Sequence, residues 1–421
     1  MNKKRQKIHD QIFIVCSLGL VFFMPIFGRI LPSVIFLMVI NWIIEGGFKK
    51  IPAIFHEKHR ILTISFTVIY ILYLVGMLYS KNMKYGFFDL QIKLSMLLFP
   101  LIFATIDKDF PIRKLTTNVF KAFIAGCVTG TLILFIISIC SFLGSSNPQV
   151  FFYTIFSRFL HPSYLSMYLN LAVSILAYYM IQKEQPLTKK LRILFFILAF
   201  YLSCVIILLS SKAGIFSLLF LYLLIVIYLL VINKQVWKGL LFFFLVLVIF
   251  YAGYSFLPII AERFKKVESV LSEQKKPSPE KMESNSERLV VWKAAIEVIR
   301  ENSIFGVGTG DVKDALLLEY QKENRSLVYN MRLNAHNQFL QTYIALGILG
   351  VLLLLSGLVL PGWLAIRRHH FIYFSFLLVF TINILVESML EVQAGVIYYA
   401  FFNALLFSGL EIVPNKVPDP N

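Results

Sequence analysis

Charged residues are scarce in this chain. Asp, Glu, Lys and Arg make up 15% of its 421 residues, whereas hydrophobic residues make up 58%. Soluble domains contain about 25% charged and about 45–50% apolar residues. The composition therefore excludes an ordinary soluble domain and predicts an integral membrane protein. The net charge of +17 comes from short basic segments between apolar runs, which is typical of topology signals and does not indicate a nucleic-acid partner.

Cysteine and the common cofactor motifs are also nearly absent. The four cysteines all fall inside apolar runs, which argues against a loop disulfide or a metal cluster and favours packed thiols. The sequence has no Walker motif, no HExxH, no GxSxG and no Cys/His zinc spacing. The glycine-rich segment 306–310 lacks the strand–turn–helix context of a nucleotide site and predicts a plain turn. We therefore expect no metal and no other cofactor.

Long apolar runs dominate the chain. A transmembrane helix needs about 20 apolar residues. The basic segment before the first run resembles a signal peptide, but no small-residue cleavage site follows it, so we expect a retained first helix. The predicted fold class is an all-α integral membrane protein with about twelve transmembrane helices: nine in residues 1–257, an external helical loop domain in 258–337, and three with a short tail in 338–421. The runs lie near 11–28, 31–45, 61–79, 86–106, 116–144, 163–182, 192–210, 213–232, 238–257, 338–361, 371–389 and 395–412.

The basic residues between these runs predict the orientation. If the N-terminus is cytoplasmic, twenty Lys and Arg residues lie in connections that face inside and five in short connections that face outside. Cytoplasmic connections of membrane proteins carry an excess of Lys and Arg. We therefore expect both termini in the cytoplasm and the long connection 258–337 on the opposite face.

The long connection reads as two helical pieces around a linker. Residues 258–273 form an amphipathic pattern that suits the bilayer surface, and residues 274–286 have the composition of a mobile linker. Ser284 and Glu287 then have the spacing of a helix-starting capping box. The helix that follows is predicted to carry its apolar stripe at Leu289, Trp292, Ile296 and Ile299.

Polar and ionisable residues gather at the ends of the runs that would face outside. A charge inside a bilayer costs about 2.5–3.5 kcal/mol, so embedded charges usually pair or line a functional cavity. Asp89 and Lys93 have i,i+4 spacing and predict a same-face pair, either structural or ligand-binding. The convergence on one face indicates an outward-facing site for an anionic substrate. The other residues of this group are Arg158, His161, Lys212, Arg288, His336, Asn383, Glu387 and Glu391.

His336 has the most suggestive surroundings. If it begins a helix, it shares one face with Leu340, Tyr343, Gly347 and Gly350. The two glycines would leave room below it for a neighbouring backbone or a lipid chain. A histidine at headgroup level without a further role is the plain alternative.

Several of these residues form a recognisable pattern. It consists of Arg288-x3-Trp292, Phe305-Gly-Val-Gly308-Thr-Gly310 and His336-Asn337-x9-Gly347-x2-Gly350, with His161-Pro-Ser-Tyr and Ser211-Lys212-Ala-Gly214 as shorter signatures. The pattern resembles the O-antigen ligase and polymerase superfamily of bacterial surface-glycan assembly. The residue directly after Gly350 is often a small hydroxyl residue in the family's ligases, whereas here it is Val351. Lys212 departs from the family's usual Arg, whose bidentate phosphate contact Lys cannot make. Ligase and polymerase both stay open.

The resemblance implies a membrane glycosyltransferase at the periplasmic face of a bacterial inner membrane. It implies a glycan donor linked to undecaprenyl diphosphate and an acceptor that is lipid A–core, another carrier-linked glycan or a protein, without metal or cofactor. His336 would act on the acceptor hydroxyl, and Arg288 would stabilise the diphosphate. The candidate substrate-binding residues are Lys212, Lys93, Arg158, His161, Asn337 and Glu387, with Asp89 and Glu391 in second rank.

A secondary transporter of an anionic substrate is the alternative from a different class. Such a protein would place its substrate groups near the bilayer midplane, on discontinuous helices and often in repeated halves. Here the polar residues lie at the outer ends of the runs and no repeat is apparent. The pattern therefore favours an enzyme.

Overall fold

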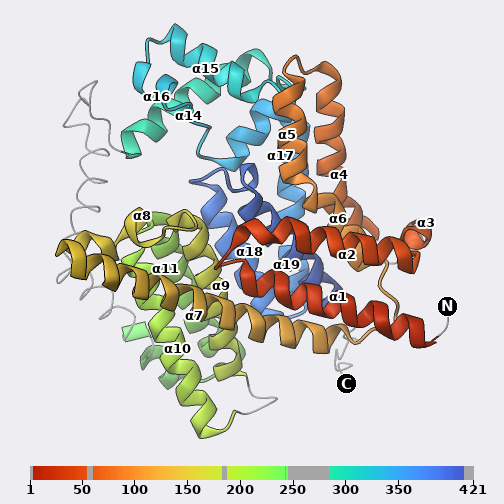
Figure 1. Ribbon diagram of the computed structural model, residues 1–421, viewed down its shortest axis with the longest axis vertical. Helices are drawn as coiled ribbons and strands as arrows, with labels where there is room; N and C mark the ends of the chain where they lie inside the picture. The colour runs from red at the N-terminus through yellow and green to blue at the C-terminus, as the bar shows by residue number, and fades with distance from the viewer. Residues whose placement is uncertain (1–2, 55–59, 183–186, 242, 245–283, 412–421) are drawn as a thin grey trace.

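The computed structural model describes residues 3–54, 60–182, 187–241, 243–244 and 284–411. Within these ranges the chain forms helices joined by turns, without a β-strand (Figure 1). The same ranges contain nine helices that are long and apolar enough to cross a membrane, and two shorter apolar helices, Thr63–Tyr79 and Phe371–Ile384. The predicted class, an all-α integral membrane protein, is confirmed. The predicted run 238–257 and the amphipathic segment 258–273 lie largely outside the described residues.

The described helices fall into two groups along the chain. The first contains α1 (Lys3–Phe23), α2 (Leu31–Glu45), α3 (Ile51–Ile54), α4 (Arg60–Gly76), α5 (Met83–Lys93), α6 (Ser95–Ala104), α7 (Ile112–Ser145), α8 (Tyr153–Phe156), α9 (Pro162–Ile181), α10 (Lys189–Leu208) and α11 (Lys212–Ile227). The second contains α14 (Ser284–Glu301), α15 (Val312–Lys322), α16 (Ser326–Asn330), α17 (Gln338–Arg367), α18 (Phe371–Ile384) and α19 (Gln393–Glu411). Short turns of helix are η1 (Gly28–Ile30), η2 (Gly47–Lys50), η3 (Met77–Tyr79), η4 (Pro148–Phe151), the π-helical η5 (Tyr228–Ile232) and η6 (Met389–Glu391).

Helices α9 and α19 form the centre of the bundle. In each, 78% of the most apolar window is buried, against 22% for the corresponding window of α10. Tyr168 of α9 stacks on Tyr398 of α19 with ring centroids 5.1 Å apart, and its hydroxyl donates to the carbonyl of Ala394 at 2.9 Å. The outer helices leave apolar side chains exposed, as expected where a helix faces lipid tails.

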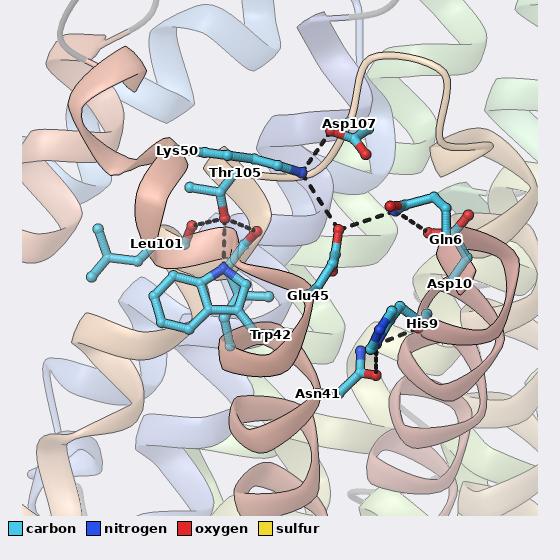
Figure 2. A network of polar contacts seen from close by, with 11 residues as sticks. Gln6, His9, Asp10, Asn41, Trp42, Glu45, Lys50, Leu101, Thr105 and Asp107 are labelled. Carbon is cyan, nitrogen blue, oxygen red and sulfur yellow. Dashed lines mark hydrogen bonds and ion pairs between the residues drawn. The ribbon is translucent and has the colours of Figure 1, made fainter. Parts of the chain in front are cut away.

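A polar network fixes the N-terminal helices at the ends of α1, α2 and α6 (Figure 2). The Lys50 ammonium lies 2.6 Å from an Asp107 oxygen and 3.4 Å from a Glu45 oxygen. The buried side chains of His9 and Asn41 bond to each other at 2.8 Å and so join α1 to α2. These contacts anchor the helices that surround the core, since isolated helix pairs in a membrane associate through packing and hydrogen bonds rather than through the hydrophobic effect.

Helices α14, α15 and α16 lie together at one end of the molecule (Figure 1). The apolar stripe of α14 does not form its buried face, because Leu289 and Ile296 are 47% and 42% exposed. The buried face instead has small side chains at the same helical period, which allow α14 to pack closely on α15 and α17. The residues of that face are Val291, Ala294, Ala295 and Val298.

Candidate active site

Glu387 joins the two residues predicted to carry the chemistry. Its Oε1 lies 2.8 Å from Nδ1 of His336, and its Oε2 lies 3.6 Å from Nη2 of Arg288. Arg288 belongs to α14, His336 directly precedes α17, and Glu387 lies between α18 and η6, so three distant segments meet here. The side chains of Arg288 and His336 keep 22% and 26% of their surface exposed, against 11% for Glu387. The two basic side chains are therefore accessible to a ligand, while the more buried Glu387 carboxylate contacts both of them.

The backbone around His336 is set by two asparagines. His336 has a φ of +44°, which is uncommon outside glycine, and its N–H donates to Oδ1 of Asn334 at 3.0 Å. Asn337 is the N-cap of α17, because its Oδ1 accepts from the N–H groups of Phe339 (2.9 Å) and Leu340 (3.2 Å). The predicted helical face that begins at His336 is therefore wrong, since the helix starts two residues later.

The charges around Glu387 favour its ionised form. Burial alone would raise the pKa of Glu387, but the hydrogen bond from His336 and the electrostatic effect of the nearby basic side chains, His336, Arg288 and His161, outweigh burial and hold that pKa below its usual range. Opposite charges and hydrogen bonds to the charged form act in this direction. Glu387 is thus a carboxylate at neutral pH, able to stabilise a positive imidazolium.

Three helices begin close to this cluster. His161 caps α9: its Nδ1 accepts from the N–H of Ser163 at 3.4 Å. Desolvation lowers the pKa of His161 more than the charge of Glu387 raises it, so burial favours the neutral form of this ring. Ser211 caps α11, and its hydroxyl bonds to that of Ser163 at 3.4 Å. Together with the capped start of α17, the positive ends of three helix dipoles favour an anion here.

Two other predicted basic residues, Lys212 and Arg158, lie in different surroundings. Lys212 is the first residue of α11 and is partly exposed beside the start of α9. Arg158 is exposed, and its Nη2 donates to the hydroxyl of Ser141 on α7 at 2.7 Å. No described contact links Arg158 to His336 or Arg288, so of these two residues Lys212 is the better placed for a ligand at the cluster.

Lys93 is fully buried and forms an ion pair with two carboxylates. Its Nζ donates to Asp89 on the same helix, and lies 2.9 Å from Oε1 of Glu391. The Lys93 side chain has no exposed surface, and that of Asp89 is 6% exposed. Of the two alternatives that the i,i+4 spacing left open, the geometry favours the structural pair.

The glycine-rich segment docks into a break in α17. Gly347 has φ +63° and ψ −160°, and the carbonyl oxygens that the break frees are bonded by another segment. The N–H of Val307 donates to the carbonyl of Ile344 at 2.7 Å, and that of Gly308 to the carbonyl of Ala345 at 3.0 Å. The N–H of Ile348 in turn donates to the carbonyl of Ser303 at 3.0 Å. These donors are used up within the protein, so the segment is a turn, as predicted, and it also ties α14 to α17.

A comparison with protein-family models matches the part of the chain that contains most of these residues. Residues 194–355 match the model described as O-Antigen ligase. The resemblance to the O-antigen ligase superfamily is confirmed. The matched range contains Lys212, Arg288, His336 and Asn337, whereas His161 and Glu387 lie outside it. A search among curated proteins found no match. Residues 194–355 of this membrane protein are thus similar to the O-antigen ligase family.

Sequence reasoning did not assign a role to one residue next to this site. Gln338 is fully buried. Its Oε1 accepts from the N–H of Leu390 at 2.7 Å, and its Nε2 lies 3.3 Å from Oε1 of Glu391. Its position directly after His336 and Asn337 was the available signal, but the partners on the far side of the site are more than fifty residues away in the sequence. Among the described residues, no cluster has the composition of a metal site.

We expect the stability contributed by Glu387 to depend on pH. A carboxyl whose pKa is lower in the folded state stabilises the fold above its unfolded pKa, about 4.3 for Glu, and loses that contribution as the pH falls through the folded pKa. The melting temperature of the detergent-purified protein should therefore fall more steeply between about pH 5 and pH 3 than that of Glu387→Gln. Parallel curves for the two proteins would contradict this assignment.

Proposed function

We propose that this protein transfers a glycan from undecaprenyl diphosphate to lipid A–core at the periplasmic face of a bacterial inner membrane. The observation that supports this most is the bridging Glu387 carboxylate, 2.8 Å from His336 and 3.6 Å from Arg288. It brings a candidate proton acceptor beside a candidate phosphate ligand. The match to the O-antigen ligase model over residues 194–355 supports the class of substrate.

His336 receives a proton in the proposed reaction. The acceptor hydroxyl oxygen attacks the anomeric carbon of the donor glycan, and the bond from that carbon to the diphosphate oxygen breaks. The electrons of the broken bond leave with the diphosphate, and the hydroxyl proton passes to the imidazole. A positioned histidine suits this role because its charge changes near working pH. Glu387 then stabilises the imidazolium in the manner of the acid in a Ser-His-Asp triad.

Arg288 and Lys212 hold the leaving diphosphate. The 3.6 Å separation between Arg288 and Glu387 is longer than a hydrogen bond, and a guanidinium has five N–H donors. Among the described residues, Glu387 is the only ion-pair partner of Arg288, so its other donors can reach phosphate oxygens. The N-termini of α9, α11 and α17 add favourable dipoles where negative charge develops.

A feature of α17 bears on the transporter alternative. Discontinuous helices in transporters use their unwound carbonyl groups to bind ions, and α17 is broken at Gly347. However, the carbonyls of Ile344 and Ala345 accept from Val307 and Gly308. Since protein backbone closes this break, the observation favours the enzyme over the transporter.

The experiment that tests this function is a gene deletion in the host. Surface glycolipids and carrier-linked glycans are run side by side, with the deletion strain complemented by the wild-type gene or by Arg288→Ala. We expect long glycan to disappear from lipid A–core and to accumulate on the carrier, and complementation to fail with Arg288→Ala at normal protein level.

Other outcomes have defined meanings. A single repeat unit on lipid A–core without long chains anywhere would assign the polymerase reaction. A change confined to glycosylated proteins would assign a protein acceptor. An unchanged pattern of all three would reject glycan transfer and return the transporter to first place.

A further inference from the structure

The segment Leu385–Glu391, which carries Glu387, is held by three consecutive residues at the start of α17. His336 bonds to Glu387 at 2.8 Å. The Nδ2 of Asn337 donates to the carbonyl of Leu385 at 2.9 Å. Gln338 follows with the contacts to Leu390 and Glu391 described above. The three side chains therefore reach the beginning, middle and end of one short segment.

The far end of this segment has a second anchor. Glu391 bonds to Nζ of Lys93 on α5 at 2.9 Å, and Lys93 also lies 4.8 Å from the ring centroid of Tyr73 on α4. A fully buried ammonium that is shared with Asp89 has few alternative positions. Glu391 is thus tied both to α5 and to α17, whereas Glu387, four residues before it, has one oxygen on His336 and one facing Arg288.

We propose that Glu391 is a positioning residue for glycan transfer, which acts by fixing the segment Leu385–Glu391 so that the Glu387 carboxylate stays on His336. This inference rests on the proposed function. Glu391 is almost buried and contacts Lys93 and Gln338, so it touches neither substrate. Its effect reaches the chemistry through the backbone of a segment only a few residues long.

Two carboxylates contact Lys93, and they provide a matched pair of variants. Glu391→Leu removes the tether but leaves the buried charge of Lys93 paired with Asp89. Asp89→Asn removes the other carboxylate and leaves the tether between Lys93 and Glu391 intact. We expect kcat to fall about 10²-fold in Glu391→Leu, since a displacement of about 1 Å at a reacting group can cost that much. In Asp89→Asn we expect kcat to stay within a few fold of wild type.

The double variant Glu391→Leu/Glu387→Gln separates positioning from a merely structural role. If Glu391 acts through Glu387, the double variant should be about as slow as the slower single variant. Independent effects would multiply instead. The KM for the lipid-linked donor should change little in Glu391→Leu, because no substrate contact is lost. Protein levels and melting temperatures of all variants are measured in parallel.

Specific outcomes would overturn the inference. They are equal kcat values for Glu391→Leu and Asp89→Asn, a multiplicative double variant, or a raised KM with unchanged kcat. Should Glu391→Leu not accumulate, Gln338→Met removes the other tether and is judged by the same cycle. Wild-type rates in both Glu387→Gln and His336→Ala would instead reject the proposed function, and this result is distinguishable from a failure of the tether alone.

Discussion

Replacing His336 by alanine is expected to lower the rate of glycan transfer about 10²- to 10⁴-fold, which is the usual contribution of a general acid or base. The substitution removes the only described partner within hydrogen-bond distance of Glu387 Oε1 and leaves the acceptor hydroxyl without a proton acceptor. The rate is measured with purified protein and a lipid-linked donor. Binding of the donor should be less affected, because Arg288 and Lys212 are still present.

The chain offers a matched control for this variant. His369 also has a left-handed backbone, with a φ of +50°, and is exposed just after the end of α17. His369→Ala should transfer glycan at the wild-type rate. If His336→Ala and His369→Ala were equally active at equal protein levels, the proton-acceptor role of His336 would be refuted.

Gly347→Ala is expected to lower the free energy of unfolding by about 2–6 kcal/mol, the sum of a backbone strain and an overpacking cost. The φ of +63° and ψ of −160° belong to a region that only glycine adopts readily. An added Cβ would also fall on the carbonyl oxygen of Ile304. The result is read from the yield of folded protein and from its thermal unfolding in detergent.

Another glycine of α17 serves as the comparison. Gly362 lies in the same helix, and an added Cβ would meet only the Leu377 side chain at 3.9 Å. Gly362→Ala should be neutral or slightly stabilising, because alanine favours helix more than glycine does. A melting temperature for Gly347→Ala equal to that of Gly362→Ala would show that the break in α17 is dispensable.

The transmembrane helices could be predicted because each depends on its own composition. Apolar length alone located the runs around Pro162–Ile181 and Gln393–Leu410, even though these helices turned out to be central rather than lipid-facing. The turn at 306–310 was also predictable, since its glycines and the missing strand are local properties. The glycine spacing did not predict that this turn bonds to the backbone around Gly347. That contact depends on how two segments far apart in the sequence pack against each other.

The candidate site was predictable residue by residue, but its connections were not. The types and locations of Arg288, His336 and Glu387 indicated an anionic ligand on one face. That Glu387 lies between the other two depends on how α14, α17 and α18 pack. Lys93 was ambiguous for the same reason: its i,i+4 partner Asp89 was visible in the sequence, whereas Glu391, nearly three hundred residues later, was not.

The docking of the glycine turn has a consequence for the length of α14. Val307 and Gly308, which follow α14, are fixed in position because they bond to α17. The length of α14 therefore sets the distance between Arg288 and this fixed turn. One residue inserted into α14 between Arg288 and Glu301 would turn Arg288 by about 100° around the helix axis and move it about 1.5 Å along that axis. The guanidinium would then face away from Glu387. The number of residues between Arg288 and the glycine turn therefore determines whether the guanidinium reaches Glu387.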